Sequence, residues 1–234
     1  MKACLTEGKI ASEKMYMQSD NTHKLRAVRH LTPSTYVLEI ERRGMEFEAG
    51  QHILLGNSES IHKREYSIYS GTRDENLEVL VKEVEEGIVS KQLKKLKEGS
   101  HLEIEGPLGF FSIDPELIKE KKKFLFVASG TGIAPFHSMV KSIPGLDYTL
   151  LHGVRYASEA YERDAYEPSR YILCTSGDDE GDFRGRVTDY IKANDFDPDT
   201  VCYFCGNFNM IREAMSLLEK KGIPPSQLHA EVYF

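Results

Sequence analysis

Cysteine and long apolar runs are both scarce in this sequence. Four cysteines among 234 residues do not make a disulfide framework, so we expect a protein of the reducing cytoplasm. No stretch approaches the ~18 consecutive apolar residues that cross a membrane. Residues 1–9 also lack the apolar segment of a signal peptide. The sequence therefore predicts a cytoplasmic protein without a membrane span.

An excess of positive charge is also absent. Lys and Arg number 30 and Asp and Glu number 37, which gives a net charge of −7. This balance disfavours nonspecific binding to nucleic acid, and we expect no nucleic-acid partner. Hydrophobic residues make up 40% and charged residues 29%, as in ordinary globular proteins. The length allows one large domain or two small ones.

A metal-binding or redox-active cysteine pair is not indicated either. Cys202 and Cys205 have the CxxC spacing, but they lie in the run Val201–Cys205, which is typical of a buried strand. Residues three apart on a strand point to opposite faces, so the two thiols should diverge. No second pair supports a zinc site and no four-cysteine set supports an iron–sulfur cluster. We expect no metal.

Apolar and polar residues alternate in the first half of the chain. The alternation occurs in three segments, residues 36–41, 77–82 and 101–105. This pattern is typical of half-buried antiparallel strands. One short helix interrupts them, with Ser90 as its expected N-cap, Leu93 and Leu96 on one face and Gly99 at its end. We predict a small β-barrel.

After about residue 118 the pattern changes. Continuous apolar runs occupy residues 124–128, 148–151, 171–174 and 201–205. Helical periodicity follows or separates them in residues 136–143, 187–191 and 211–218. Buried strands that alternate with amphipathic helices predict a parallel sheet. We therefore expect a barrel domain over residues 1–118 and a doubly wound α/β domain over residues 119–234, separated by the charged run Lys119–Lys123.

A glycine-containing turn follows the first apolar run of the second half. The residues are Gly130-Thr131-Gly132-Ile133-Ala134-Pro135. Glycines at this place let the backbone approach a pyrophosphate, whose charge is met by the N-terminus of the next helix. Pro135 suits the first helical turn. A tight turn that binds no ligand is the alternative interpretation.

A second motif, Arg64-Glu65-Tyr66-Ser67, lies in the barrel half. Its cation, ring and hydroxyl could serve one ligand that has a phosphate and an aromatic ring. Arg64 and Ser67 would lie on opposite faces of a regular strand, so this interpretation requires a bend or a strand end. The alternative is a surface arginine beside a buried tyrosine.

Six motifs in this order resemble the ferredoxin–NADP reductases, especially their bacterial branch. The resemblance runs from about residue 25 to the C-terminus; residues 1–24 match nothing in it. It is carried by Arg64-x-Tyr66-Ser67, Gly87-Ile88-Val89-Ser90, Gly106-Pro107-Leu108-Gly109, Gly130-Thr131-Gly132-Ile133-Ala134-Pro135, Cys205-Gly206-Asn207 and the ending Ala230-Glu231-Val232-Tyr233-Phe234.

The resemblance implies that the barrel holds FAD. Arg64 would pair with the FAD pyrophosphate, Tyr66 would pack on the isoalloxazine ring, and Ser67 would hydrogen-bond near its N5 atom. In the segment that begins at Gly87, the amides of Ile88, Val89 and Ser90 would receive the pyrophosphate. A plain helix cap is the alternative for that segment.

The resemblance also implies that the second domain holds NADP(H). Its pyrophosphate would lie on the turn Gly130-Thr131-Gly132, and Cys205 would stand near the nicotinamide C4. Glu231 could stabilise charge on the nicotinamide or relay a proton. Tyr233 would cover the flavin face, and Phe234 could reach toward the adenine end. Each of these residues has a plainer alternative. Cys205 could be a buried thiol at a strand end, and Glu231 an exposed carboxylate near a flexible terminus. Tyr233 and Phe234 could form a docked apolar tail.

The identity of the nicotinamide cofactor depends on a few charged residues. A 2′-phosphate needs partners such as arginine. Arg155, Arg186 and Ser176 match phosphate-binding positions of the bacterial pattern, and Arg184 could replace a third arginine. The acids Asp178–Glu180 could instead bind the ribose hydroxyls of NADH. We favour NADPH.

The expected activity is that of an FAD-dependent ferredoxin (or flavodoxin)–NADP+ reductase with a separate protein carrier. One alternative is an NADH-dependent reductase component of an oxygenase system, and another is a nonenzymatic nucleotide-binding module. Ferredoxin and flavodoxin carriers are usually acidic, so a local basic patch on this protein would dock them. The simpler interpretation of its lysines is a solvated surface without a partner. The candidate residues are Lys91, Lys94, Lys95, Lys97, Lys119 and Lys121–Lys123.

Overall fold

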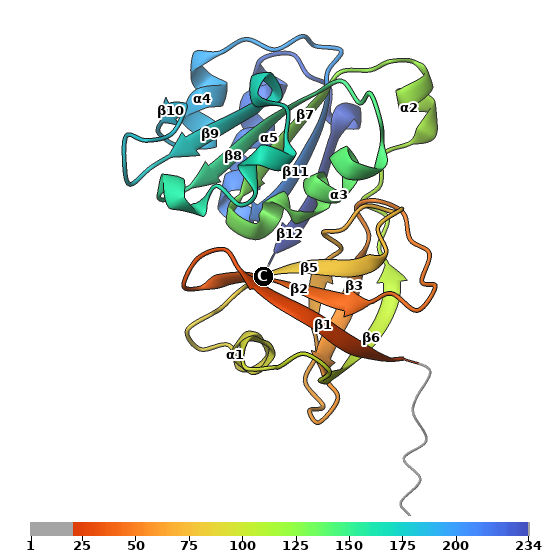
Figure 1. Cartoon of the computed structure of the whole chain (residues 1–234). Coiled ribbons are helices and arrows are strands. Elements are labelled where there is room, and N and C mark those ends of the chain that lie inside the picture. The colour runs from red at the N-terminus through yellow and green to blue at the C-terminus, as the bar shows by residue number, and fades with distance from the viewer. Residues whose placement is uncertain (1–20, 234) are drawn as a thin grey trace, which may run out of the picture.

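The computed structural model describes residues 21–233 and contains two sheets that lie one above the other (Figure 1). Phe234 and residues 1–20 lie outside the described residues. No helix in residues 21–233 is long and apolar enough to cross a membrane. In the same residues no group of His, Cys, Asp or Glu could hold a metal ion.

The first sheet is antiparallel throughout and has the order β4-β3-β6-β1-β2-β5. A bridge between Ile68 and Val79 joins the end of β4 to β5, so the sheet closes into a barrel. The predicted barrel is thus confirmed. Its strands are β1 (Thr22–His30), β2 (Thr35–Glu41), β3 (His52–Asn57), β4 (Arg64–Ser67), β5 (Asn76–Lys82) and β6 (His101–Leu108).

The short helix of the barrel, α1 (Ile88–Lys94), differs from the prediction at both ends. Its N-cap is Gly87, not Ser90, because the buried Ser90 hydroxyl accepts a hydrogen bond from the Val84 amide at 3.1 Å. Its C-cap is Lys95, whereas Gly99 belongs to the turn that leads into β6.

The second sheet is parallel and has the order β10-β9-β8-β7-β11-β12. Helix α3 packs on one face and helices α4 and α5 on the other, which confirms the doubly wound fold. Cys205 belongs to the first face and Cys202 to the second, so the two thiols diverge as predicted. The elements are α2 (Pro115–Lys119), β7 (Phe124–Ser129), α3 (Ala134–Ser142), β8 (Tyr148–Val154), β9 (Tyr171–Thr175), β10 (Phe183–Arg184), α4 (Val187–Ala193), β11 (Val201–Asn207), α5 (Phe208–Lys220) and β12 (Leu228–Tyr233).

The two sheets share an apolar core. Val37, Tyr69 and Leu80 of the barrel half pack in the same cluster as Phe126 and Phe136 of the α/β half. Apolar burial of this kind stabilises the junction, so the surfaces on either side of it keep a defined relation. The boundary between residues 118 and 119 stays a prediction.

Candidate active site between the two sheets

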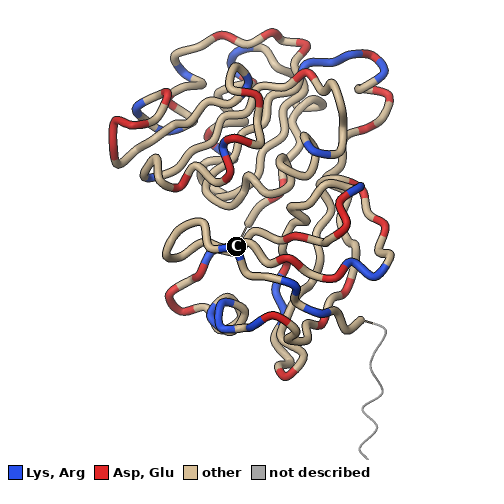
Figure 2. Tube along the Cα trace, viewed as in Figure 1, with Lys and Arg blue, Asp and Glu red and all other residues tan. Residues whose placement is uncertain are grey.

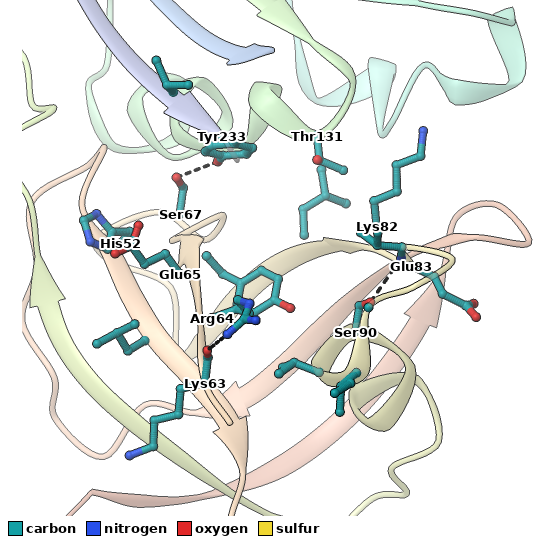
Figure 3. A pocket seen from close by; sticks show the side chains of 18 of the residues that line it. His52, Lys63, Arg64, Glu65, Ser67, Lys82, Glu83, Ser90, Thr131 and Tyr233 are labelled. Atoms are coloured by element: carbon teal, nitrogen blue, oxygen red, sulfur yellow. Dashed lines mark hydrogen bonds between the residues drawn. The ribbon is translucent and has the colours of Figure 1, made fainter. Parts of the chain in front are cut away.

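An open cleft of about 880 Å³ lies where the barrel meets the C-terminal strand. We call it the larger cleft. Strands β3, β4 and β5, helix α1 and strand β12 line it, and Figure 3 shows Tyr233 on one side of it and Arg64 and Ser90 on the other. Its lining includes the candidate residues Arg64, Tyr66, Ser67, Gly87, Ile88, Val89, Ser90, Thr131, Glu231 and Tyr233.

Strand β4 ends inside this cleft. Arg64 is exposed, Tyr66 is partly buried and Ser67 is buried at the last position of the strand. The strand end that the sequence analysis required is therefore present, and all three residues line the cleft. The Arg64 guanidinium donates to the Lys63 carbonyl at 2.8 Å, and within residues 21–233 no ion pair engages it. Arg64 can therefore pair with an anionic ligand.

Helix α1 begins beside Arg64 without a side-chain cap. The amides of its first turn have no partner within the helix, so they can receive an anion. A Cβ atom at Gly87 would lie 2.9 Å from the Ser90 Oγ, so a larger residue here would require Ser90 to shift. An arginine and the amides at a helix start fit the pyrophosphate of a dinucleotide.

Residues of β12 and β4 meet at the other side of the cleft. The Tyr233 hydroxyl donates to the Ser67 Oγ at 2.6 Å (Figure 3). The Ser67 Oγ in turn donates to the Glu231 Oε2 at 3.1 Å. Cys205 on β11 pairs in register with Glu231 on β12. Four candidate residues from three strands thus form one cluster: Ser67, Cys205, Glu231 and Tyr233.

Burial controls the charge of this cluster. It raises the pKa of the Cys205 thiol and of the Tyr233 hydroxyl well above their ordinary values, so both stay neutral near pH 7. Burial also raises the pKa of Glu231, and the hydrogen bond from Ser67 and the nearby His52 oppose that rise. Glu231 is thus the titratable acid of the cluster.

His52 is a member of the site that the sequence analysis missed. It lines the larger cleft and its Nδ1 lies 3.6 Å from the Glu231 Oε1. It lies opposite Ser67 in the β3–β4 register, 15 residues away along the chain. The residue spacing contains no signal for this contact, since it depends on how the strands pair.

A second cleft of about 540 Å³ lies at the carboxyl ends of β7 and β8. We call it the smaller cleft. Four candidate residues line it, namely Gly130, Arg155, Ser176 and Arg186. Lys82 lines both clefts, so the two are neighbours along the junction of the sheets.

Among the described candidates, Gly132, Arg184 and the buried Cys205 line neither cleft. A Cβ atom at Gly132 would lie 2.3 Å from the Cys205 carbonyl oxygen, so this glycine permits close approach of the turn to β11. The Arg184 Nε lies 3.1 Å from the Asp179 Oδ1, in an exposed ion pair.

The acids near the smaller cleft are occupied by local contacts. The Asp178 carboxylate accepts hydrogen bonds from the Ala157 amide at 2.8 Å and the Glu180 amide at 3.3 Å. Asp179 pairs with Arg184, and none of Asp178–Glu180 lines the cleft. The cations Arg155 and Arg186 therefore line the cleft without these three acids. Two other acids line it as well, Glu159 and Glu213, and each is paired with a lysine.

Comparison with known proteins identifies the family. The oxidoreductase FAD-binding domain matches residues 23–113 and the oxidoreductase NAD-binding domain matches residues 126–216. Ferredoxin–NADP reductase B of Sorangium cellulosum is 30% identical over 237 residues, which cover 90% of this chain and 96% of that protein. The chain belongs to the ferredoxin–NADP reductase family. It therefore has an FAD-binding domain and a nicotinamide-dinucleotide-binding domain.

Other members of the family are similar over much of the chain. The toluate 1,2-dioxygenase electron transfer component of Pseudomonas putida is 29% identical over 88% of this chain, which spans 65% of that protein's length. The crystal structure of a ferredoxin NADP+ reductase from Neisseria gonorrhoeae with bound FAD and NADP has the same fold. Its TM-score is 0.80 at 24% identity, over 91% of this chain and 98% of that one.

Proposed function

We propose that this reductase transfers hydride between NADPH and FAD and exchanges single electrons with a separate carrier, ferredoxin or flavodoxin, in the cytoplasm. The observation that carries the proposal is the arrangement of the two clefts. The larger cleft is large enough for a dinucleotide, and the hydrogen-bonded residues Ser67, Glu231 and Tyr233 line it. Two arginines line the neighbouring smaller cleft.

The residues of the larger cleft fit FAD. Arg64 and the uncapped start of α1 would hold its pyrophosphate, and Tyr66 would pack against its ring system. Burial raises the pKa of Tyr66 to about 12, so this ring contributes no charge near neutral pH. A bound FAD supplies the hydride acceptor and the single-electron chemistry of the reaction.

The cluster at β12 would handle the nicotinamide half. The Ser67 hydroxyl, held between Tyr233 and Glu231, presents a polar atom at a fixed place in the cleft. Glu231 would balance charge on the nicotinamide or hold a proton at its Oε2. The neutral thiol of Cys205 would border the nicotinamide C4, and Tyr233 would occupy the stacking position until the nicotinamide displaces it.

The smaller cleft would hold the other half of NADPH. Arg155, Arg186 and Ser176 would receive the 2′-phosphate, while Gly130 and Thr131 would lie along the pyrophosphate. Arginine is suited to this contact because its planar guanidinium forms paired, charge-assisted hydrogen bonds to phosphate oxygens.

An anaerobic titration of the purified protein with NADPH and, separately, with NADH tests the proposal. We expect NADPH to bleach the visible band of oxidised flavin rapidly and NADH to bleach it slowly. A preference for NADH would favour the second candidate, an NADH-dependent reductase component of an oxygenase system, to which the similarity with the toluate dioxygenase component points. A colourless protein that binds no added FAD would contradict both.

A further inference from the structure

His52 touches the one carboxylate of the β12 cluster. Its Nδ1 lies 3.6 Å from the Glu231 Oε1, whereas the Glu231 Oε2 accepts the hydrogen bond from Ser67 at 3.1 Å. The two oxygens of Glu231 therefore face different partners. The side chains of His52 and Glu231 are 18% and 21% exposed, so the contact is shielded but still reached by water.

The backbone confines the imidazole at this place. His52 begins β3 and pairs with Ser67 on β4 and with Leu108 on β6. Gly109 follows β6 and packs on the ring, because a Cβ atom there would lie 2.8 Å from the His52 Nδ1. Strand pairing on two sides thus directs the ring toward Glu231.

The groups that face Glu231 come from four strands. Burial raises the pKa of Glu231, and the carboxylate of Glu65 on β4 adds to that rise. Cys205 on β11 and Tyr233 on β12 are neutral near pH 7, because burial raises both of their pKa values. The basic group in contact with Glu231 is His52, and its charge lowers the pKa of Glu231.

We propose that His52 is a positioning residue for Glu231: its imidazole holds one oxygen of the carboxylate, so that the other oxygen faces Ser67. The contact would thereby keep the Glu231 carboxylate in place where the nicotinamide approaches, a consequence that rests on the proposed function.

NMR titration of the full chain with carboxyl-labelled glutamate tests the contact directly. The signal that disappears in Glu231→Gln identifies Glu231. In His52→Asn, which keeps a side-chain N–H but has no charge, we expect Glu231 to titrate about 1 pH unit higher than in the wild type. His101→Asn is the matched control, since His101 is exposed at the start of β6 and lines neither cleft. An unchanged Glu231 titration in His52→Asn would overturn the proposal, and His52→Gln repeats the test if the first variant does not fold.

The pH dependence of hydride transfer gives a second readout. We expect His52→Asn to move the part of the profile that reports Glu231 to higher pH, by about the same 1 pH unit, with little change in KM for NADPH. The double variant His52→Asn/Glu231→Gln should be no slower than Glu231→Gln alone, because His52 acts through Glu231. A His52→Asn profile that superimposes on the wild-type profile would count against the proposal. Since the NMR titration needs no hydride transfer, it decides the contact even if neither nicotinamide reduces the flavin.

Discussion

The two clefts hold their polar side chains in different ways. In the larger cleft, the buried Ser67 is hydrogen-bonded to both Glu231 and Tyr233, which are themselves partly buried. In the smaller cleft, Arg155 and Arg186 are exposed, and within residues 21–233 no ion pair engages either of them. A buried network fixes geometry, whereas exposed cations attract a charged ligand and adapt to it. The difference suits chemistry in the first cleft and recognition in the second.

The largest effect should come from breaking the buried network. Glu231→Gln keeps the size of the side chain but removes its charge, and we expect hydride transfer to slow by about 100-fold. The flavin content should not change, because the contacts of the Glu231 carboxylate are with Ser67 and His52, whereas Arg64 and the start of α1 would hold the FAD pyrophosphate. Stopped-flow reduction by NADPH measures the rate. A rate within about twofold of the wild type would mean that the network only supports the strand end.

Removing the exposed cations should weaken recognition and spare the chemistry. We expect Arg155→Ala and Arg186→Ala each to raise KM for NADPH by about 10-fold, because a charge-assisted hydrogen bond contributes about 1.5–3 kcal/mol. KM for NADH should change little. Steady-state kinetics with both cofactors measure this, with Arg26→Ala on the barrel, where Arg26 pairs with Glu41, as the control. Equal effects on the two cofactors would contradict a 2′-phosphate site.

Tyr233 belongs to the same network as Glu231, but its ring should compete with the nicotinamide for the stacking position. Tyr233→Ser removes the ring that competes with the nicotinamide, so we expect NADP+ to bind about 10-fold more tightly, by the loss of one aromatic stacking contact. Equilibrium titration of the flavin absorbance measures the affinity. If the affinity stays the same, Tyr233 does not occupy the nicotinamide position.

The smallest effect concerns the lysines outside both clefts. Figure 2 shows basic residues along α1 and acidic residues on the segment that precedes it. Several of these lysines already have partners: Lys94 pairs with Glu83, and Lys122 lies 2.8 Å from Asp199. We therefore expect charge reversal of Lys121–Lys123 to slow electron transfer to ferredoxin by only about threefold at low salt. An unchanged salt dependence would remove this segment from the docking surface.

The periodicity of the chain was sufficient to predict both sheets. The alternating residues 36–41 lie in β2, and the apolar run 124–128 forms most of β7. A strand that is buried on one face has alternating polar and apolar residues, whereas a strand that is buried on both faces is apolar throughout. The helix cap at Ser90 was wrong for a local reason. A serine hydroxyl can bond to any nearby amide, and here it bonds to Val84, which precedes the helix.

The candidate site was predictable where its members lie within one motif. Arg64, Tyr66 and Ser67 lie on a strand that ends in the larger cleft, and Gly130 and Thr131 lie on one turn. The arrangement of side chains in such a short motif can be predicted from the sequence, because neighbouring residues share one local backbone conformation.

Other features depended on residues far apart in the chain. The sequence alone indicated a barrel, a parallel sheet, the order of the motifs and two arginines suited to a phosphate. Only the tertiary structure brought His52 to Glu231, engaged Asp178 with backbone amides and paired Arg184 with Asp179. Strand register and loop packing decide such contacts, and both arise from the whole fold rather than from local spacing. The charge of each cleft is therefore a property of the assembled molecule.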